Sequence, residues 1–91
     1  MADIPFTQYV RPHGRPEPVS INRPDAVSEV AGRIIARGLR FECEALTTGE
    51  VSFTIFDPKE QADVDIEICR NGPDVPAAVD RLVLRNAGSA A

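Results

Sequence analysis

Apolar and polar residues alternate along the middle of the chain, between Leu39 and Ile68. A period of two residues is typical of a β-strand with one buried face, because successive side chains of a strand point to opposite sides of the sheet. Turn-forming residues at 47–50 and 57–61 divide the region into three strands, which predicts an antiparallel meander. Its expected inward side chains are Leu39, Phe41, Cys43, Val51, Phe53, Ile55, Val64, Ile66 and Ile68.

Helical periodicity flanks the meander on both sides. The segment 24–37 has apolar residues three or four positions apart and a proline at its start, and a second helix is expected from Pro76 onward. Residues 4–10 and 19–21 indicate two strands of a hairpin. We therefore predict an α+β domain with the order β-β-α-β-β-β-α, in which two helices pack on one face of an antiparallel sheet of about five strands.

The length and composition exclude several classes of protein. A chain of 91 residues supports one core, so we expect a single domain over residues 1–88 and a frayed tail at 89–91. The net charge of −4 opposes binding to nucleic acid, and no apolar run approaches the roughly 20 residues of a membrane helix. The first residues lack the basic and apolar regions of a signal peptide, and two cysteines are few for a small secreted domain. We expect a cytoplasmic protein that is a monomer or a homodimer.

The same alternation predicts a polar outer surface on the meander. Strands lie about 4.8 Å apart, so acidic residues of its first and third strands would lie roughly 10 Å apart on one face. Such a face is a candidate binding site for a basic protein surface, and the alternative is a solvated face that discourages aggregation. Carboxylates spaced along strands rarely converge on a cation, so no metal or cofactor is expected. The candidate partner-binding residues are Glu42, Glu44, Asp63, Asp65, Glu67, Ser52 and Thr54.

A second, weaker candidate site involves two turns. The only histidine, His13, lies between Arg11 and Arg15, and no nucleophile or carboxylate stands beside it. Asn71 and Gly72 belong to a loop that could present Asn71 and the first amides of the second helix to an anion, although such a string more often only turns the chain. We treat these five residues as a possible anion or ligand site.

Three strings, residues 4–9, 46–51 and 71–73, resemble short proteins of bacteria and their phages that have no established activity. The resemblance implies provenance and a cytoplasmic setting only. The order of elements over 24–87 is also that of double-stranded RNA-binding domains, but the second helix here begins Pro76-Ala77-Ala78 rather than with lysines.

Two hypotheses for the function follow. The favoured one is a non-enzymatic accessory protein that binds another protein through its acidic sheet face, for example to inhibit a host nucleic-acid machine. The alternative is a small enzyme or ligand-binding domain with a site around His13 and residues 71–74.

Overall fold

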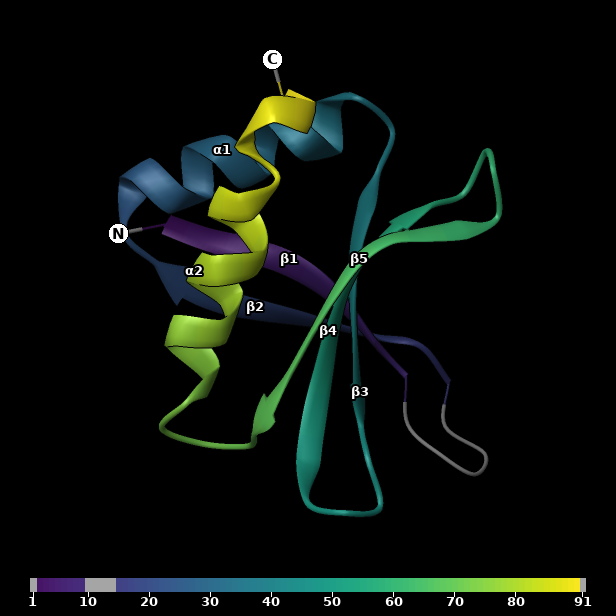
Figure 1. The fold of residues 1–91 in the computed structure, drawn as a ribbon, viewed down its shortest axis with the longest axis vertical. Coiled ribbons are helices and arrows are strands. Elements are labelled where there is room, and N and C mark those ends of the chain that lie inside the picture. Colours follow the sequence, from purple (N-terminus) through teal and green to yellow (C-terminus); the bar gives the residue numbers. More distant parts are fainter. Residues whose placement is uncertain (1, 10–14, 91) are drawn as a thin grey trace.

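The structure is a computed structural model that describes residues 2–9 and 15–90. It is an α+β fold with the predicted order of elements, in which two helices cover a five-stranded sheet (Figure 1). The elements are β1 (Ala2–Tyr9), β2 (Glu17–Arg23), α1 (Asp25–Ala36), β3 (Arg40–Ala45), β4 (Glu50–Asp57), β5 (Ala62–Arg70), α2 (Val75–Arg85) and the 3-10 turn η1 (Ala87–Ala90). The turn η1 contacts α1 and occupies part of the segment predicted to be a tail.

The strands lie in the order β2-β1-β3-β4-β5. The predicted hairpin and meander are both antiparallel, but β1 pairs with β3 in parallel, so the sheet is mixed rather than purely antiparallel. The parallel pairing covers only Thr7 to Tyr9 of β1. Pro5 lies just before this stretch, and a proline has no N–H to donate to a neighbouring strand.

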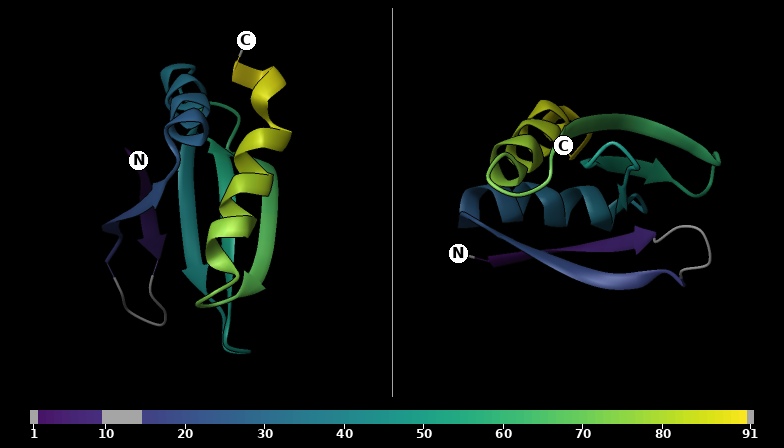
Figure 2. Two further views of the ribbon diagram at one scale, coloured as in Figure 1. Left: turned by 90° about the vertical axis from the view of Figure 1, so that its left-hand side faces the viewer. Right: turned by 90° about the horizontal axis from the view of Figure 1, so that it is seen from below.

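Both helices pack on one side of the sheet, which we call the inner face. The sheet curves around them, so that its two edge strands, β2 and β5, both contact α2 (Figure 2). Three phenylalanine rings from neighbouring strands form the centre of the core, with the centroid of Phe6 lying 5.2 Å from that of Phe41 and 5.5 Å from that of Phe53. The apolar stripes of α1 and α2 close this core from above.

The strand β5 is turned over relative to the prediction. Ile66 and Ile68 are 47% and 50% exposed, whereas Asp65 and Glu67 lie on the inner face and pair with arginines of α2. In the ladder Glu67 is directly opposite Phe53, which is buried in the core. Opposed residues share a face of a sheet, so the predicted sidedness of these four residues was wrong.

A β-bulge causes this inversion. Phe56 of β4 pairs with Asp63, but the preceding residue, Ile55, pairs with Asp65, so Val64 is an extra residue without a partner. One extra residue moves every later side chain of a strand to the opposite face. Without the bulge Ile55 would oppose Val64, and the isoleucines of β5 would enter the core as predicted.

Candidate functional site

The acidic side chains predicted to share one surface are divided between two. Asp65 and Glu67 lie on the inner face, beside α2. Glu42 and Glu44 lie on β3 and point to the other side of the sheet, which we call the outer face, and Asp63 is exposed near the β4–β5 hairpin. A continuous acidic platform is therefore absent from the part of the chain that the structure describes.

Asp65 and Glu67 belong to a network that we call the inner cluster. Arg85 donates from Nε to Asp65 at 2.7 Å and lies 2.9 Å from Glu67 through Nη1. Arg81 donates to Glu67 at 2.8 Å, and the amide of Asn86 donates to Asp65 at 2.8 Å. Both carboxylates are thus neutralised by the helix that covers them, which removes them as contacts for an outside partner.

The inner cluster shifts the ionisation of its members in the direction of ion pairing. The hydrogen bond from Arg85 lowers the pKa of Asp65 to about 2, and the bonds from Arg81 and Arg85 hold the pKa of Glu67 below its ordinary value. The hydrogen bonds of Arg85 to Asp65 and Glu67 raise its own pKa. Asp65, Glu67 and Arg85 therefore remain charged at neutral pH.

On the outer face, the charge of Glu42 is also compensated. Its carboxylate accepts a hydrogen bond from Arg40 at 2.7 Å and from the hydroxyl of Tyr9 at 3.1 Å. Burial and the bond to Glu42 raise the pKa of Tyr9. The guanidinium of Arg40 lies 4.9 Å from the centre of the Phe56 ring, within range of a cation–π contact. This side of the face is an ordered polar network rather than a group of free carboxylates.

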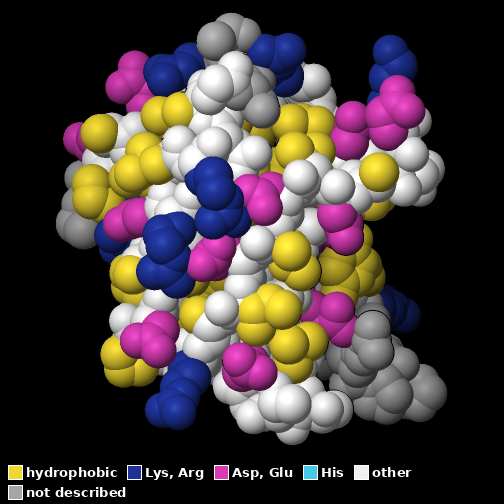
Figure 3. All heavy atoms as spheres, viewed as in Figure 1, with side chains coloured by type: hydrophobic (Ala, Val, Ile, Leu, Met, Phe, Trp, Pro, Cys, Tyr) yellow, Lys and Arg dark blue, Asp and Glu magenta, His cyan; other side chains and the backbone are white. Residues whose placement is uncertain are grey.

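The remaining predicted residues lie under or beside the two isoleucines. Ser52 is opposite Ile68 and is only 7% exposed, and Thr54 is opposite Ile66 and half-buried. Ile66 and Ile68 thus form an apolar strip along the outer face of β5, and Figure 3 shows hydrophobic side chains at the surface beside the paired blue and magenta groups. We call this strip, together with the half-buried Phe56, the outer strip.

Sequence reasoning missed the outer strip because the alternation of β5 fits either sidedness. The signal that could have revealed it is the spacing of Arg81 and Arg85, which lie one turn apart on the second helix. Two arginines on the flank of a helix that packs on a sheet favour carboxylates beneath them.

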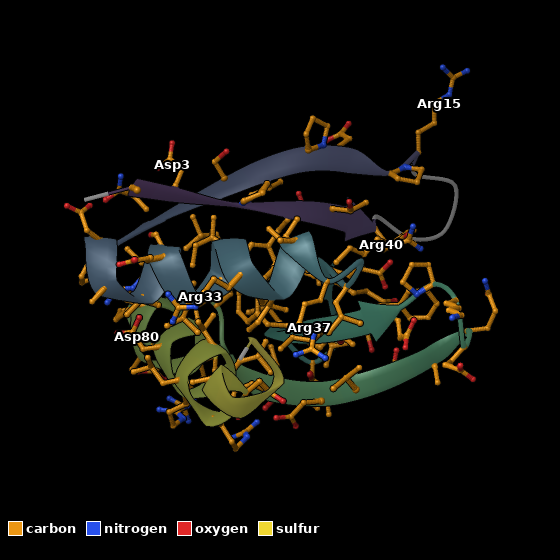
Figure 4. All side chains as sticks on the ribbon, turned by 90° about the horizontal axis from the view of Figure 1, so that it is seen from above. Asp3, Arg15, Arg33, Arg37, Arg40 and Asp80 are labelled. Carbon is orange, nitrogen blue, oxygen red and sulfur yellow. The ribbon has the colours of Figure 1, made fainter. Side chains whose placement is uncertain are left out.

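The second predicted site is only partly described. Arg11 and His13 lie outside the described residues, and Arg15 extends away from the body of the protein (Figure 4). Asn71 lines an open hollow of about 530 Å³ between the β3–β4 turn and the end of β5. Gly72 has a φ of 111°, in the left-handed region that favours glycine, which fits a turn into α2. The residues lining the hollow are Thr48, Gly49, Glu50, Arg70 and Asn71.

Neither cysteine is placed to act as a nucleophile. Cys43 and Cys69 are both buried, and burial raises the pKa of each thiol, which disfavours the nucleophilic thiolate. Within residues 2–9 and 15–90, no three His, Cys, Asp or Glu side chains are grouped so that they could hold a metal ion.

No helix in the described part of the chain has the length and apolar character needed to cross a membrane. Comparisons of the chain with protein-family models, with curated proteins and with solved structures find no match.

Proposed function

We propose that this protein is a non-enzymatic, cytoplasmic accessory protein that binds another protein through the outer face of its sheet. The observation that carries the proposal is the outer strip, in which Ile66 and Ile68 stand half-exposed side by side on β5. Apolar side chains that gather on a surface beside polar groups are typical of protein interaction sites.

The neighbouring side chains define the chemistry of the partner. Beside the two isoleucines lie Thr54 and Ser52 of β4, and beyond these the outer face of β3 carries Glu42 and Glu44. The exposed Asp63 lies opposite Phe56. A partner surface with apolar side chains next to basic ones complements this arrangement. Three carboxylates, of which Glu42 is already paired with Arg40, form a weaker mimic of nucleic acid than the five predicted from the sequence, so we favour a mixed apolar and basic partner surface over a phosphate-binding groove.

The test begins with affinity capture from the cells that make the protein and continues with the purified partner. Ile68→Lys is expected to abolish binding, because it places a flexible charge in the outer strip beside Ile66. Leu84→Lys is the matched control, since Leu84 is 51% exposed but lies on α2. Equal binding by both variants would contradict the proposal, and so would equal loss in both.

The salt dependence gives a second, independent readout. Glu44→Lys is expected to weaken binding and to reduce its sensitivity to salt, because it removes a charge that attracts the basic part of the partner. Lys59 lies on the β4–β5 turn, away from β3, and Lys59→Glu serves as the control of opposite sign.

A further inference from the structure

The outer edge of β5 is a strand edge that no other described strand covers, because β5 is last in the sheet order. An uncovered edge offers a row of backbone N–H and C=O groups to any extended chain, including a second copy of the same protein. Natural sheets protect such edges, and in this protein side chains bind the backbone groups of the edge strand.

Two members of the inner cluster bind the backbone of Ile66 at this edge. The Ile66 N–H donates to Oδ1 of Asp65 at 2.8 Å. The Ile66 carbonyl accepts from Nη2 of Arg85 at 3.3 Å. Arg85 in turn holds Asp65 at 2.7 Å, so one ion pair satisfies both edge groups of the middle residue of the strand.

We infer that α2 guards the edge of β5, and that the partner it excludes is a second copy of this chain pairing β5 against β5. With Ile66 opposite its own copy, the N–H and C=O of each Ile66 would complete a pair of antiparallel ladder bonds. The side chains suit this register, because the exposed Ile66 and Ile68 of both copies would lie on one continuous outer face.

On the inner face, charge repulsion between the two copies would also oppose this pairing. Asp65 of one copy would lie opposite Glu67 of the other, and these like charges can approach only if the arginines of α2 remain with them. A second strand at this edge would need the N–H and C=O of Ile66, which Asp65 and Arg85 already bind. The two caps and the second strand therefore exclude each other. The inner cluster thus keeps the edge closed by hydrogen bonds and by charge.

The test uses two double variants that leave the net charge unchanged. Asp65→Val with Arg85→Ala removes both caps of Ile66. Glu67→Val with Arg81→Ala removes a similar ion pair from the same strand and helix but leaves the caps in place. We expect the first variant to double the solution mass of 9.9 kDa by sedimentation, and the second to remain at the mass of the unaltered protein.

Amide hydrogen exchange shows whether the association uses this edge. In the first variant, exchange at Ile66 and Ile68 is expected to slow as the protein concentration rises, whereas in the unaltered protein it is independent of concentration. The inference is overturned if the first variant stays monomeric, if both variants associate equally, or if the unaltered protein already pairs through these amides.

If the first double variant does not fold, Asp65→Ala with Arg85→Met supplies the test. This pair also removes both caps of Ile66 and leaves the net charge unchanged, but it keeps a long side chain at position 85, so concentration-dependent protection at Ile66 and Ile68 is still expected. Exchange that does not change with concentration in this variant overturns the inference. These results are independent of the test of the proposed function, because Ile68→Lys changes the outer strip and leaves both caps of Ile66 intact.

Discussion

Arg23 of β2 and Asp80 of α2 form a two-armed ion pair that joins one edge of the sheet to the last helix. Nε of Arg23 donates to Oδ1 of Asp80 at 2.7 Å and Nη2 donates to Oδ2 at 2.6 Å. The two residues are 57 positions apart in the sequence, and their side chains are only 15% and 29% exposed. The pair therefore fixes the first hairpin to α2, and the hydrogen bond raises the pKa of Arg23.

Removing one partner leaves the other half-buried and unpaired. Asp80→Ala is expected to lower the free energy of unfolding by about 1–3 kcal/mol, measured by urea denaturation. Glu29→Ala is the control, because Glu29 and Arg33 form an exposed pair with an N–O distance of 3.7 Å on α1. Its expected effect is within about 0.5 kcal/mol. Equal losses from the two substitutions would show that the Arg23–Asp80 pair has no special role.

The two phenylalanines of β4 test which face of this strand is buried. Phe53 is buried against Phe6, whereas Phe56 is half-buried under Arg40 on the outer face. Phe53→Ala is expected to cost about 3–5 kcal/mol of unfolding free energy. Phe56→Ala is expected to cost about 1 kcal/mol, as is common for a partly exposed side chain. The order of the two losses in urea denaturation would be reversed if the faces of β4 were exchanged.

The inner cluster predicts a loss of stability in acid. The pKa of Asp65 in the folded protein, about 2, lies below its ordinary value of 3.8, so folding favours the charged form. The stabilisation is complete above the ordinary value and is lost as the pH falls towards about 2. The pKa of Glu67 is shifted in the same direction and adds to the effect.

The loss of stability in acid should become smaller when the carboxylate of Asp65 is removed. Asp65→Asn is expected to be less stable than the unaltered protein at neutral pH, and its unfolding midpoint should change less over the acidic window. Asp63→Asn, at an exposed site on the same strand, should keep the full dependence. Thermal unfolding followed over this pH range measures both, and identical curves for the two variants would exclude the inner cluster as the cause.

The order and type of the elements could be predicted from local patterns. The helical spacing of Val27, Val30 and Ile34 and the alternation of Phe41 with Glu42 each fit one structure only, and both are confirmed. The parallel pairing of β1 with β3 could not be predicted, because it depends on contacts between segments that no local pattern relates.

The candidate site was less predictable, since it depends on which way a single strand faces. Alternating residues define two faces but do not say which one is buried, and a shift of one residue exchanges them. The bulge at Val64 makes this shift. The shifted register is favourable because Arg81 and Arg85 form ion pairs with the carboxylates that it turns inward. The acidic face predicted from the sequence therefore lost Asp65 and Glu67.

The role of the bulge can be tested by shortening β5. Deletion of Val64 removes the unpaired residue and leaves Asp65 opposite Ile55 in a regular ladder, so the inner cluster should persist. Because Val64 is 43% exposed and lies outside the core, the expected change in unfolding free energy is about 1 kcal/mol or less. Nuclear Overhauser contacts between the backbones of Phe53 and Glu67 would verify the register.

Deletion of Ile66 is the matched control for this experiment. Whichever end of β5 keeps its register, one of the two carboxylates must leave the inner face, since side chains alternate along the strand. We expect the loss of the corresponding arginine contact and a larger drop in stability than for the deletion of Val64. If the deletion of Val64 is the more damaging of the two, the bulge itself, rather than the pairing of Asp65 and Glu67 with α2, holds β5 in its observed orientation.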